Sequence, residues 1–272
     1  MKKKLIILTI ITIILAIVLG ILLNYTYQNL KAYAASQSFL NSSLKFQEEN
    51  EKTIFSINKI TYFSNCNAEI ATNSNSSFEI SDLYQYTDIA IFLSPDSENL
   101  TSKNTIKSVI LENINFSLLP SIGKPSLYYK NINDFAKPTF LKENLINEAI
   151  TFYATSEDKI DYTKPILYNN CANPITLCYV NSNIKDKFTL SNNILNLSHD
   201  GTLLKTCGIT LSSIACKLSL NITITNNLNE TYYCPVVINI PLSTESNTIY
   251  DGNLTLKDNT NYKFIRINQK VN

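Results

Sequence analysis

The chain has few of the residues that most often carry chemistry in proteins. Its 272 residues include no tryptophan, one histidine (His199), one arginine (Arg266) and five glycines. None of the glycines belongs to a Gly-x-Ser-x-Gly elbow, a phosphate-binding loop or a dinucleotide fingerprint. A single arginine nearly excludes bidentate recognition of phosphate, although lysine still binds phosphate as a point charge. The formal net charge of +1, with charged residues scattered along the chain, argues against a nucleic-acid partner.

A long apolar run at the N-terminus is the most informative feature that is present. Lys2, Lys3 and Lys4 precede Leu5–Leu23, which contains no charged residue. As a helix this run is roughly 28 Å long, close to the thickness of the hydrocarbon core of a bilayer. Lysines stay on the cytoplasmic side of such a span. We therefore expect a single-pass protein of the cell membrane, with residues 1–4 in the cytoplasm, the lipid bilayer as its first partner, and the bulk of the chain extracytoplasmic.

A possible cleavage site follows the apolar run. Ala32-Tyr33-Ala34, before Ala35, has the small-x-small pattern of a signal-peptidase site. However, the run is longer than the usual signal-peptide core of about 7–15 residues, and it ends roughly a dozen residues before Ala34. A retained anchor is the preferred interpretation. A mature N-terminus at Ala35, detected by mass spectrometry, would show cleavage instead.

Residues 24–62 are expected to continue the helix as a stalk. Neither glycine nor proline, the strongest helix breakers, occurs between Ile21 and Ser94. Apolar residues recur at three- and four-residue intervals from Leu23 to Ala34, and again from Leu40 to Leu44. The polar stretch 64–77 is then expected to be a loop between the stalk and the domain.

Residues 63–272 are expected to form a β-rich antiparallel domain, so that the chain is mainly β. The clearest strand begins at Cys216, where apolar and polar residues alternate up to Thr225. A polar turn follows at 226–229, and 232–240 is a plausible antiparallel partner. Many short strands separated by turns and prolines indicate a sandwich. A division into two subdomains near residue 160 is left open.

The six cysteines are candidates for disulfides. They are Cys66, Cys171, Cys178, Cys207, Cys216 and Cys234. An extracytoplasmic location gives oxidising conditions, which favour disulfides. If all six pair within the chain, Cys66 must bridge to the C-terminal group, although the sequence leaves the connectivity open. No Cys-x2-Cys pair occurs, and we expect no metal site and no cofactor.

A short segment around one cysteine resembles a known active site. Leu203-Leu204-Lys205-Thr206-Cys207 is similar to the Thr-Leu-x-Thr-Cys strand of sortases, with Leu203 in place of the threonine. Sortases are anchored β-barrel enzymes that use one Cys, one His and one Arg. The resemblance implies a cysteine transpeptidase with Cys207 as the nucleophile and His199 and Arg266 as its partners. In that family the His lies far upstream of the Cys, whereas His199 is eight residues away.

The overall layout resembles type IV pilins and pseudopilins. In these proteins an N-terminal hydrophobic helix runs into a stalk that packs on a disulfide-stapled β domain, which implies an assembly subunit. The glycine before the apolar run and the early glutamate of that family are missing here. The sequence therefore favours a non-enzymatic cell-envelope protein whose ectodomain binds another envelope or surface protein. The pilin-like and sortase-like functions stay as alternatives.

Overall fold

The computed structural model describes the chain in separate segments. They are residues 15–16, 18–24, 26–27, 54–72, 77–95, 101–155, 161, 163–168, 174–190, 202–240, 243–244, 247–248, 252–257 and 262–267. The chain divides into two compact units, 1–52 and 53–272. The described residues of the first unit are α-helical. None of the described helices is long and apolar enough to cross a membrane. The rest of the expected span and most of the expected stalk lie outside the described residues.

Two β-sheets make up most of the larger unit. Within the described residues, the first sheet has five strands in the order β12-β1-β2-β7-β4, and the second has six in the order β13-β9-β8-β3-β5-β6. All neighbouring strands are antiparallel except β5 and β6. The first sheet contains β1 (Phe55–Thr72), β2 (Phe78–Pro95), β4 (Lys124–Tyr129), β7 (Ile175–Leu190) and β12 (Gly252–Lys257). The second contains β3 (Ile106–Leu118), β5 (Ile150–Thr155), β6 (Ile166–Tyr168), β8 (Cys216–Asn226), β9 (Thr231–Ile240) and β13 (Ile265–Ile267).

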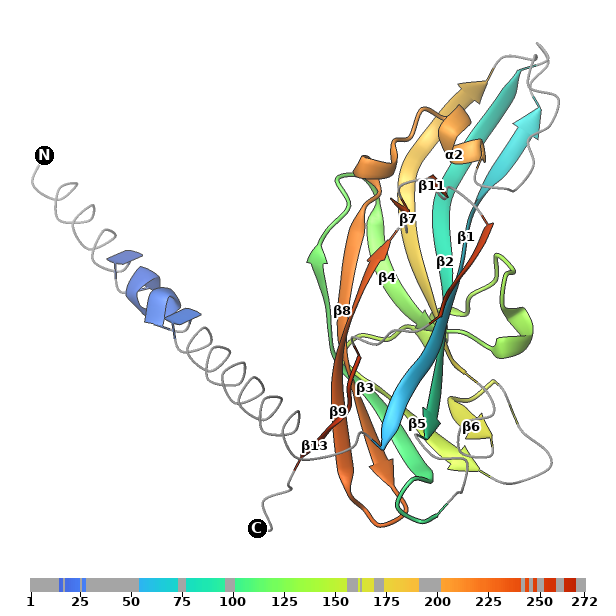
Figure 1. Cartoon of the computed structure of the whole chain (residues 1–272). Helices are drawn as coiled ribbons and strands as arrows, with labels where there is room; N and C mark the ends of the chain where they lie inside the picture. Colours follow the sequence, from blue (N-terminus) through green and yellow to red (C-terminus); the bar gives the residue numbers. More distant parts are fainter. Residues whose placement is uncertain are drawn as a thin grey trace, which may run out of the picture. The chain divides into compact units, whose positions relative to one another are not determined.

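The remaining elements are short. Strands β10 (Ser243–Thr244) and β11 (Asn247–Thr248) form a separate pair. The helix α2 (Thr202–Thr206) lies at one end of the larger unit (Figure 1). The described residues also include three 3-10 turns: η1 (Ile132–Asp134), η2 (Lys142–Asn144) and η3 (Leu211–Ser213).

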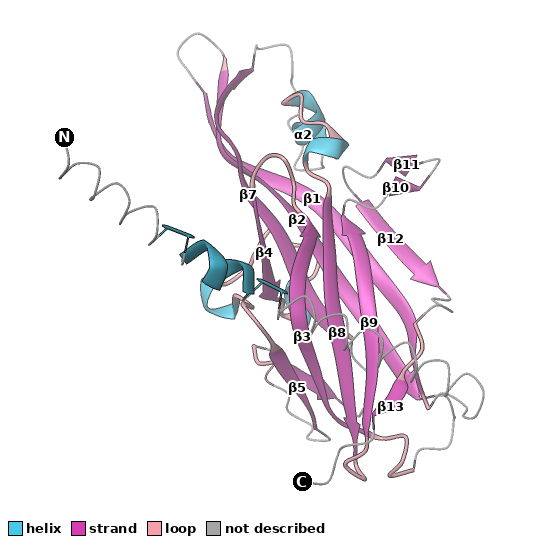
Figure 2. Ribbon diagram, turned by 90° about the vertical axis from the view of Figure 1, so that its left-hand side faces the viewer, coloured by secondary structure: helices cyan, strands magenta, loops and turns pink. Residues whose placement is uncertain are grey.

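The two sheets pack face to face (Figure 2). Their main apolar cluster joins Ile89 and Leu177 of the first sheet to Val109 and Ile222 of the second. Each such side chain contributes about 1.5–3 kcal/mol when it is fully buried. The expectation of a mainly β, largely antiparallel fold is therefore confirmed. Strands from both sides of residue 160 share this core, so the described residues show no division there.

The β8–β9 hairpin agrees closely with the sequence pattern. Along β8, the apolar residues from Cys216 to Ile224 are buried, and Lys217 on the other face is exposed. The strand ends at Asn226, and β9 pairs back on it with Thr225 opposite Thr231. Strict alternation of apolar and polar residues found this hairpin because one of its faces is buried and the other is solvated.

The first strand corrects two expectations. Residues 55–62 were expected to be the end of the helical stalk and 64–77 a loop, but β1 runs from Phe55 to Thr72. The absence of glycine and proline permits a helix without favouring one over a strand. Register shifts at Ile57/Lys59 and Asn67/Glu69 break the alternation that would have revealed the strand. The expected domain boundary at residue 63 thus falls inside a strand.

Two smaller clusters flank the main core. One contains Cys66 and Cys207 and lies under α2, on the inner face of the first sheet. The other contains Tyr86 and Cys178 and lies on the outer face of that sheet. Gln85, paired with Cys66 in register, is fully buried beside the first of these clusters.

Candidate functional site

The outer face of the first sheet carries a buried ion pair. Successive side chains of a strand point to opposite faces. Because Ile89 and Tyr179 point into the main core, their neighbours Asp88 and Cys178 point outward, opposite each other in register. Lys130 directly follows β4, whose Tyr128 pairs with Cys178. In the strand order β2-β7-β4, Asp88 and Lys130 come from the two sides of β7, and their side chains meet on the outer face of the sheet.

The segment 131–146 covers this pair. The ring of Phe140 packs on Tyr128, with 4.9 Å between the centroids, and on Tyr84, with 5.7 Å. The Tyr84 hydroxyl donates to the carbonyl of Pro138 at 3.1 Å. The side chains of Asp88 and Lys130 are therefore only 0% and 2% exposed.

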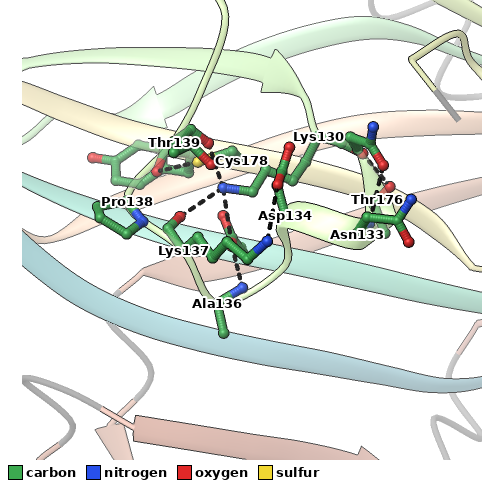
Figure 3. A network of polar contacts seen from close by, with 12 residues as sticks. Lys130, Asn133, Asp134, Ala136, Lys137, Pro138, Thr139, Thr176 and Cys178 are labelled. Carbon is green, nitrogen blue, oxygen red and sulfur yellow. Dashed lines mark hydrogen bonds and ion pairs between the residues drawn. The ribbon is translucent and has the colours of Figure 1, made fainter.

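The Lys130 ammonium group is surrounded by three acceptors, two of which are the carbonyls of Lys137 and Thr139 (Figure 3). Its Nζ lies 3.3 Å from Oδ2 of Asp88 and donates to the carbonyls of Lys137 at 2.8 Å and Thr139 at 2.5 Å. Three acceptors match the three N–H groups of an ammonium ion. The Tyr86 ring adds a cation–π contact, with its centroid 5.8 Å from Nζ.

The same carboxylate also holds the backbone of the covering segment. The backbone N–H of Ala136 donates to Oδ2 of Asp88 at 2.7 Å. Ala136 has a φ of 67°, a left-handed conformation that is strained for alanine. Asp88 therefore stabilises a turn that the local sequence disfavours. The pair fastens segment 131–146 to the sheet at two points, through Ala136 and through the carbonyls that Lys130 binds.

Burial controls the acidity of the groups in this cluster. Burial raises the pKa of the Asp88 carboxyl to about 6, although Lys130, the Cys178 thiol and the Ala136 N–H all act to lower it. Burial, with the nearby Asp88 charge, also raises the pKa of the Cys178 thiol well above its ordinary value. A thiol of this kind is a poor nucleophile because little of it is ionised.

Asp88 should make the domain more stable in mild acid than at neutral pH. The folded carboxyl has a pKa of about 6 against an ordinary 3.8, so between these values the folded chain keeps a proton that the unfolded chain has lost. This contribution is complete below the unfolded pKa and is lost as the pH rises through the folded pKa. The shift corresponds to up to about 3 kcal/mol. Urea unfolding at about pH 4 and pH 7 should show the wild type gaining stability over Asp88→Asn in acid, and a constant difference would contradict this.

The arrangement is suited to holding a structure rather than to acting on a substrate. Both charged groups are sealed from solvent, and Lys130 Nζ and Oδ2 of Asp88 hydrogen-bond to the protein's own backbone. Sequence reasoning did not single out either residue. A charged residue inside the apolar run from Tyr86 to Leu93 is the signal that could have found Asp88. Nothing in the sequence pointed to its partner.

The residues of the sortase-like alternative are not brought together where the structure describes them. Cys207 is 4% exposed and packs under α2, before the first residue of β8. Arg266 pairs with Tyr232, which lies opposite Ile224 near the last residue of β8. Eleven strand residues, about 35 Å, separate the two ends, and Figure 1 places α2 and β13 at opposite ends of the sandwich. His199 lies outside the described residues.

Arg266 has a structural role at its own end. Its guanidinium lies 2.5 Å from Oε1 of Glu230. The other oxygen of Glu230 accepts from Asn226 Nδ2 and from the Tyr232 hydroxyl, each at 2.9 Å. The Asn226 bond, ahead of the Arg266 charge, keeps the pKa of the Glu230 carboxyl below its usual value. The arginine thus braces the β8–β9 turn.

The cysteines are buried wherever they are described. Cys66, Cys178, Cys207, Cys216 and Cys234 are buried, and no S–S bond joins any two of these five in the structure. Cys171 lies outside the described residues. The predicted disulfides therefore stay predictions at this point.

Neither metal clusters nor relatives point to a function. In the part of the chain that the structure describes, no group of three or more His, Cys, Asp or Glu residues is placed to hold a metal ion. Comparison of the chain with family models, with curated proteins and with solved structures gave no match. The function must therefore be argued from the chain's own residues.

Proposed function

We propose that the chain is a single-pass, membrane-anchored protein of the cell envelope whose β-rich ectodomain binds another envelope or surface protein. In this proposal residues 1–4 are cytoplasmic, Leu5–Leu23 spans the bilayer and the sandwich lies outside. The domain acts by binding and catalyses no reaction. The observation that carries the proposal is the apolar N-terminal run together with the helix found within it.

The described part of that helix exposes apolar side chains on more than one face. Leu15, Leu19, Ile21, Leu22 and Leu23 are each more than half exposed. Consecutive helical residues are about 100° apart, so the three residues 21–23 cannot lie in one narrow stripe. A helix that is apolar around much of its circumference is suited to lipid rather than to water.

The ectodomain is suited to a binding role because its two sheets bury their apolar faces against each other and need no further element to form a core. The inner face of the first sheet packs on the second sheet, and segment 131–146 covers part of the outer face. In the arrangement that the pilin resemblance implies, a helical stalk covers the sheet. In the present structure the stretch 55–62, which that arrangement would give to the stalk, is a strand of the first sheet. The anchored binding domain is therefore better supported than pilin-like assembly.

Labelling of introduced cysteines tests the proposal. The full chain is expressed in a bacterial host, with Lys3→Cys or Leu228→Cys, and spheroplasts are treated with a membrane-impermeant maleimide. Leu228 is 53% exposed in the β8–β9 turn, whereas the described native cysteines are buried. We expect Leu228→Cys to be labelled in intact spheroplasts and Lys3→Cys only after lysis. The unsubstituted chain gives the background.

Alkaline carbonate extraction completes this test. The proposal expects the chain to stay in the membrane pellet. A chain that is extracted, or a Leu228→Cys variant that is protected until lysis, would overturn it. Photo-crosslinking to a surface protein on intact cells, from exposed positions such as Leu119 and Tyr153, tests the binding role.

A further inference from the structure

Two cysteines that are far apart in the sequence share one small buried cluster. Cys66 and Cys207 are 1% and 4% exposed. The other buried members are all aliphatic: Ile80, Leu83, Ile184, Leu203, Leu204, Ile209 and Ile214. The cluster lies between the first sheet and the segment around α2, which contacts β1.

Cys66 is held on the rigid side of this cluster. It lies within β1, paired with Gln85 of β2, on the face that points into the protein. Its backbone N–H donates to Oδ1 of Asn65 at 2.7 Å. The strand on either side of it is hydrogen-bonded to β2, which fixes the place of the thiol.

Cys207 is held by the way α2 ends. Its N–H donates to the carbonyl of Leu203 at 2.9 Å, and Gly208 then adopts a φ of 72°. The N–H of Gly208 donates to the backbone carbonyl of Lys205 at 2.9 Å, and the N–H of Ile209 donates to the backbone carbonyl of Leu204 at 3.0 Å. This is the Schellman pattern, with Cys207 as the C-cap and a glycine at the left-handed position. Leu204 and Ile209, at the positions of its usual apolar contact, both belong to the cluster.

The other described cysteines are not members of this cluster, since Cys216 and Cys234 belong to the main core. Cys178 lies on the opposite face of the sheet. Cys216 faces Ile240, whereas Cys234 faces Ile222, so the last two are six residues apart along the hairpin. That is about 20 Å, well beyond the Cα separation of roughly 4–7 Å that a disulfide requires. Among the described cysteines, only Cys66 and Cys207 share a cluster on facing elements.

We propose that Cys66 and Cys207, which are not at bonding distance in this structure, are an oxidative modification site, at which an approach of α2 to β1 lets a disulfide form and fasten the two elements. A helix of five residues has little stability of its own in water. A disulfide at the C-cap of α2 would anchor this helix over the apolar cluster that it covers. The proposal rests on the proposed function to the extent that an extracytoplasmic location supplies the oxidising compartment.

The bond forms by thiol–disulfide exchange while the cluster is still accessible. One cysteine thiolate attacks a small-molecule disulfide, such as oxidised glutathione, and releases one glutathione thiolate. The second cysteine thiolate then attacks the mixed disulfide and releases the other. Two protein thiols lose two electrons and two protons, and one glutathione disulfide is reduced to two thiols.

Peptide mapping under non-reducing conditions tests the pairing. The full chain, in detergent micelles, is refolded in a glutathione redox buffer, alkylated and digested. Trypsin alone is insufficient because no lysine or arginine separates Cys207 from Cys216. Chymotrypsin, which cleaves after Leu211, resolves them. We expect the Cys66 peptide to be linked to the Cys207 peptide. Alkylated Cys66, or Cys66 linked to another cysteine, would overturn the proposal.

Thermal unfolding with and without dithiothreitol gives a second readout. Reduction should lower the Tm of the wild type by roughly 10 °C, because the bond closes a very long loop. Cys66→Ala/Cys207→Ala should show no such drop. The matched control Cys216→Ala/Cys234→Ala should keep it. A drop that is equal in the two double variants would count against the pairing.

Protein isolated from spheroplast membranes separates this proposal from the proposed function. A bond found in the refolded chain and in the isolated protein supports both. A bond found only in the refolded chain supports the pairing but counts against the extracytoplasmic location. Failure to form the bond in the redox buffer overturns the pairing and leaves the labelling test of topology unaffected.

Discussion

Replacing Asp88 with alanine should lower the free energy of unfolding by about 3–5 kcal/mol. The substitution removes one of the three acceptors of the Lys130 ammonium group at a site where that side chain is 2% exposed. It also removes the acceptor of the Ala136 N–H, which lies in a strained left-handed turn. An unsatisfied buried donor costs about 1–3 kcal/mol by itself. Urea unfolding at neutral pH measures the loss.

The hydrogen bonds of Asp88 should matter more than its charge. Burial raises the pKa of this carboxyl to about 6. Ionising it at pH 7 therefore costs more free energy in the folded state than in the unfolded state. Asparagine keeps an oxygen that can accept from Ala136 and from Lys130. We therefore expect Asp88→Asn to be no less stable than the wild type at pH 7. Adding Lys130→Met to Asp88→Ala should recover part of the loss, because it removes the buried charge.

A surface pair in the same segment provides the control. Asp134 and Lys137 lie 3.2 Å apart, with side chains 42% and 58% exposed. Asp134→Ala should change the stability by less than about 1 kcal/mol, as is usual for exposed pairs. If Asp88→Ala cost no more than this control, the pair would not be what fastens segment 131–146 to the sheet.

The buried pair shows why a site of this kind is hard to predict from one sequence. Asp88 and Lys130 meet only because β7 lies between β2 and β4, although β7 comes later in the chain than both. Local patterns predict strands but do not give their order in a sheet. Residue types gave equally little help, because lysine and aspartate are ordinary surface residues unless their burial is known.

The fold was predictable where the strands are regular. The β8–β9 hairpin was found because every second residue from Cys216 to Ile224 is buried and no register shift interrupts the pairing. Strand β1 was missed because two register shifts break its alternation. The asparagine- and serine-rich run at 73–77 also made the stretch 64–77 resemble a loop. Cys66 was expected to bridge to the C-terminal group of cysteines. Its burial could not be predicted, because it lies in the strand β1 that the sequence analysis missed.

Replacing Phe55 with alanine should cost about 3–5 kcal/mol, and this tests the corrected start of the domain. Phe55 is fully buried at the first position of β1. Its ring meets Tyr232 edge-on with 5.1 Å between centroids, and Phe264 with 6.5 Å. Tyr232 belongs to the second sheet, so Phe55 joins the two sheets at this end. In a domain of this size the loss should lower Tm by roughly 10 °C.

The same substitution distinguishes a strand from a stalk at this position. A phenylalanine near the end of an exposed helical stalk would tolerate alanine with a change below about 0.5 kcal/mol. Phe55→Leu should cost less than Phe55→Ala because it leaves a smaller cavity. Ser56→Ala, whose side chain points to the other face of β1, should have little effect. A small loss for Phe55→Ala would move the start of the sandwich towards residue 63. A large loss would place residues 55–62 in its core and shorten the stalk that the sequence predicts.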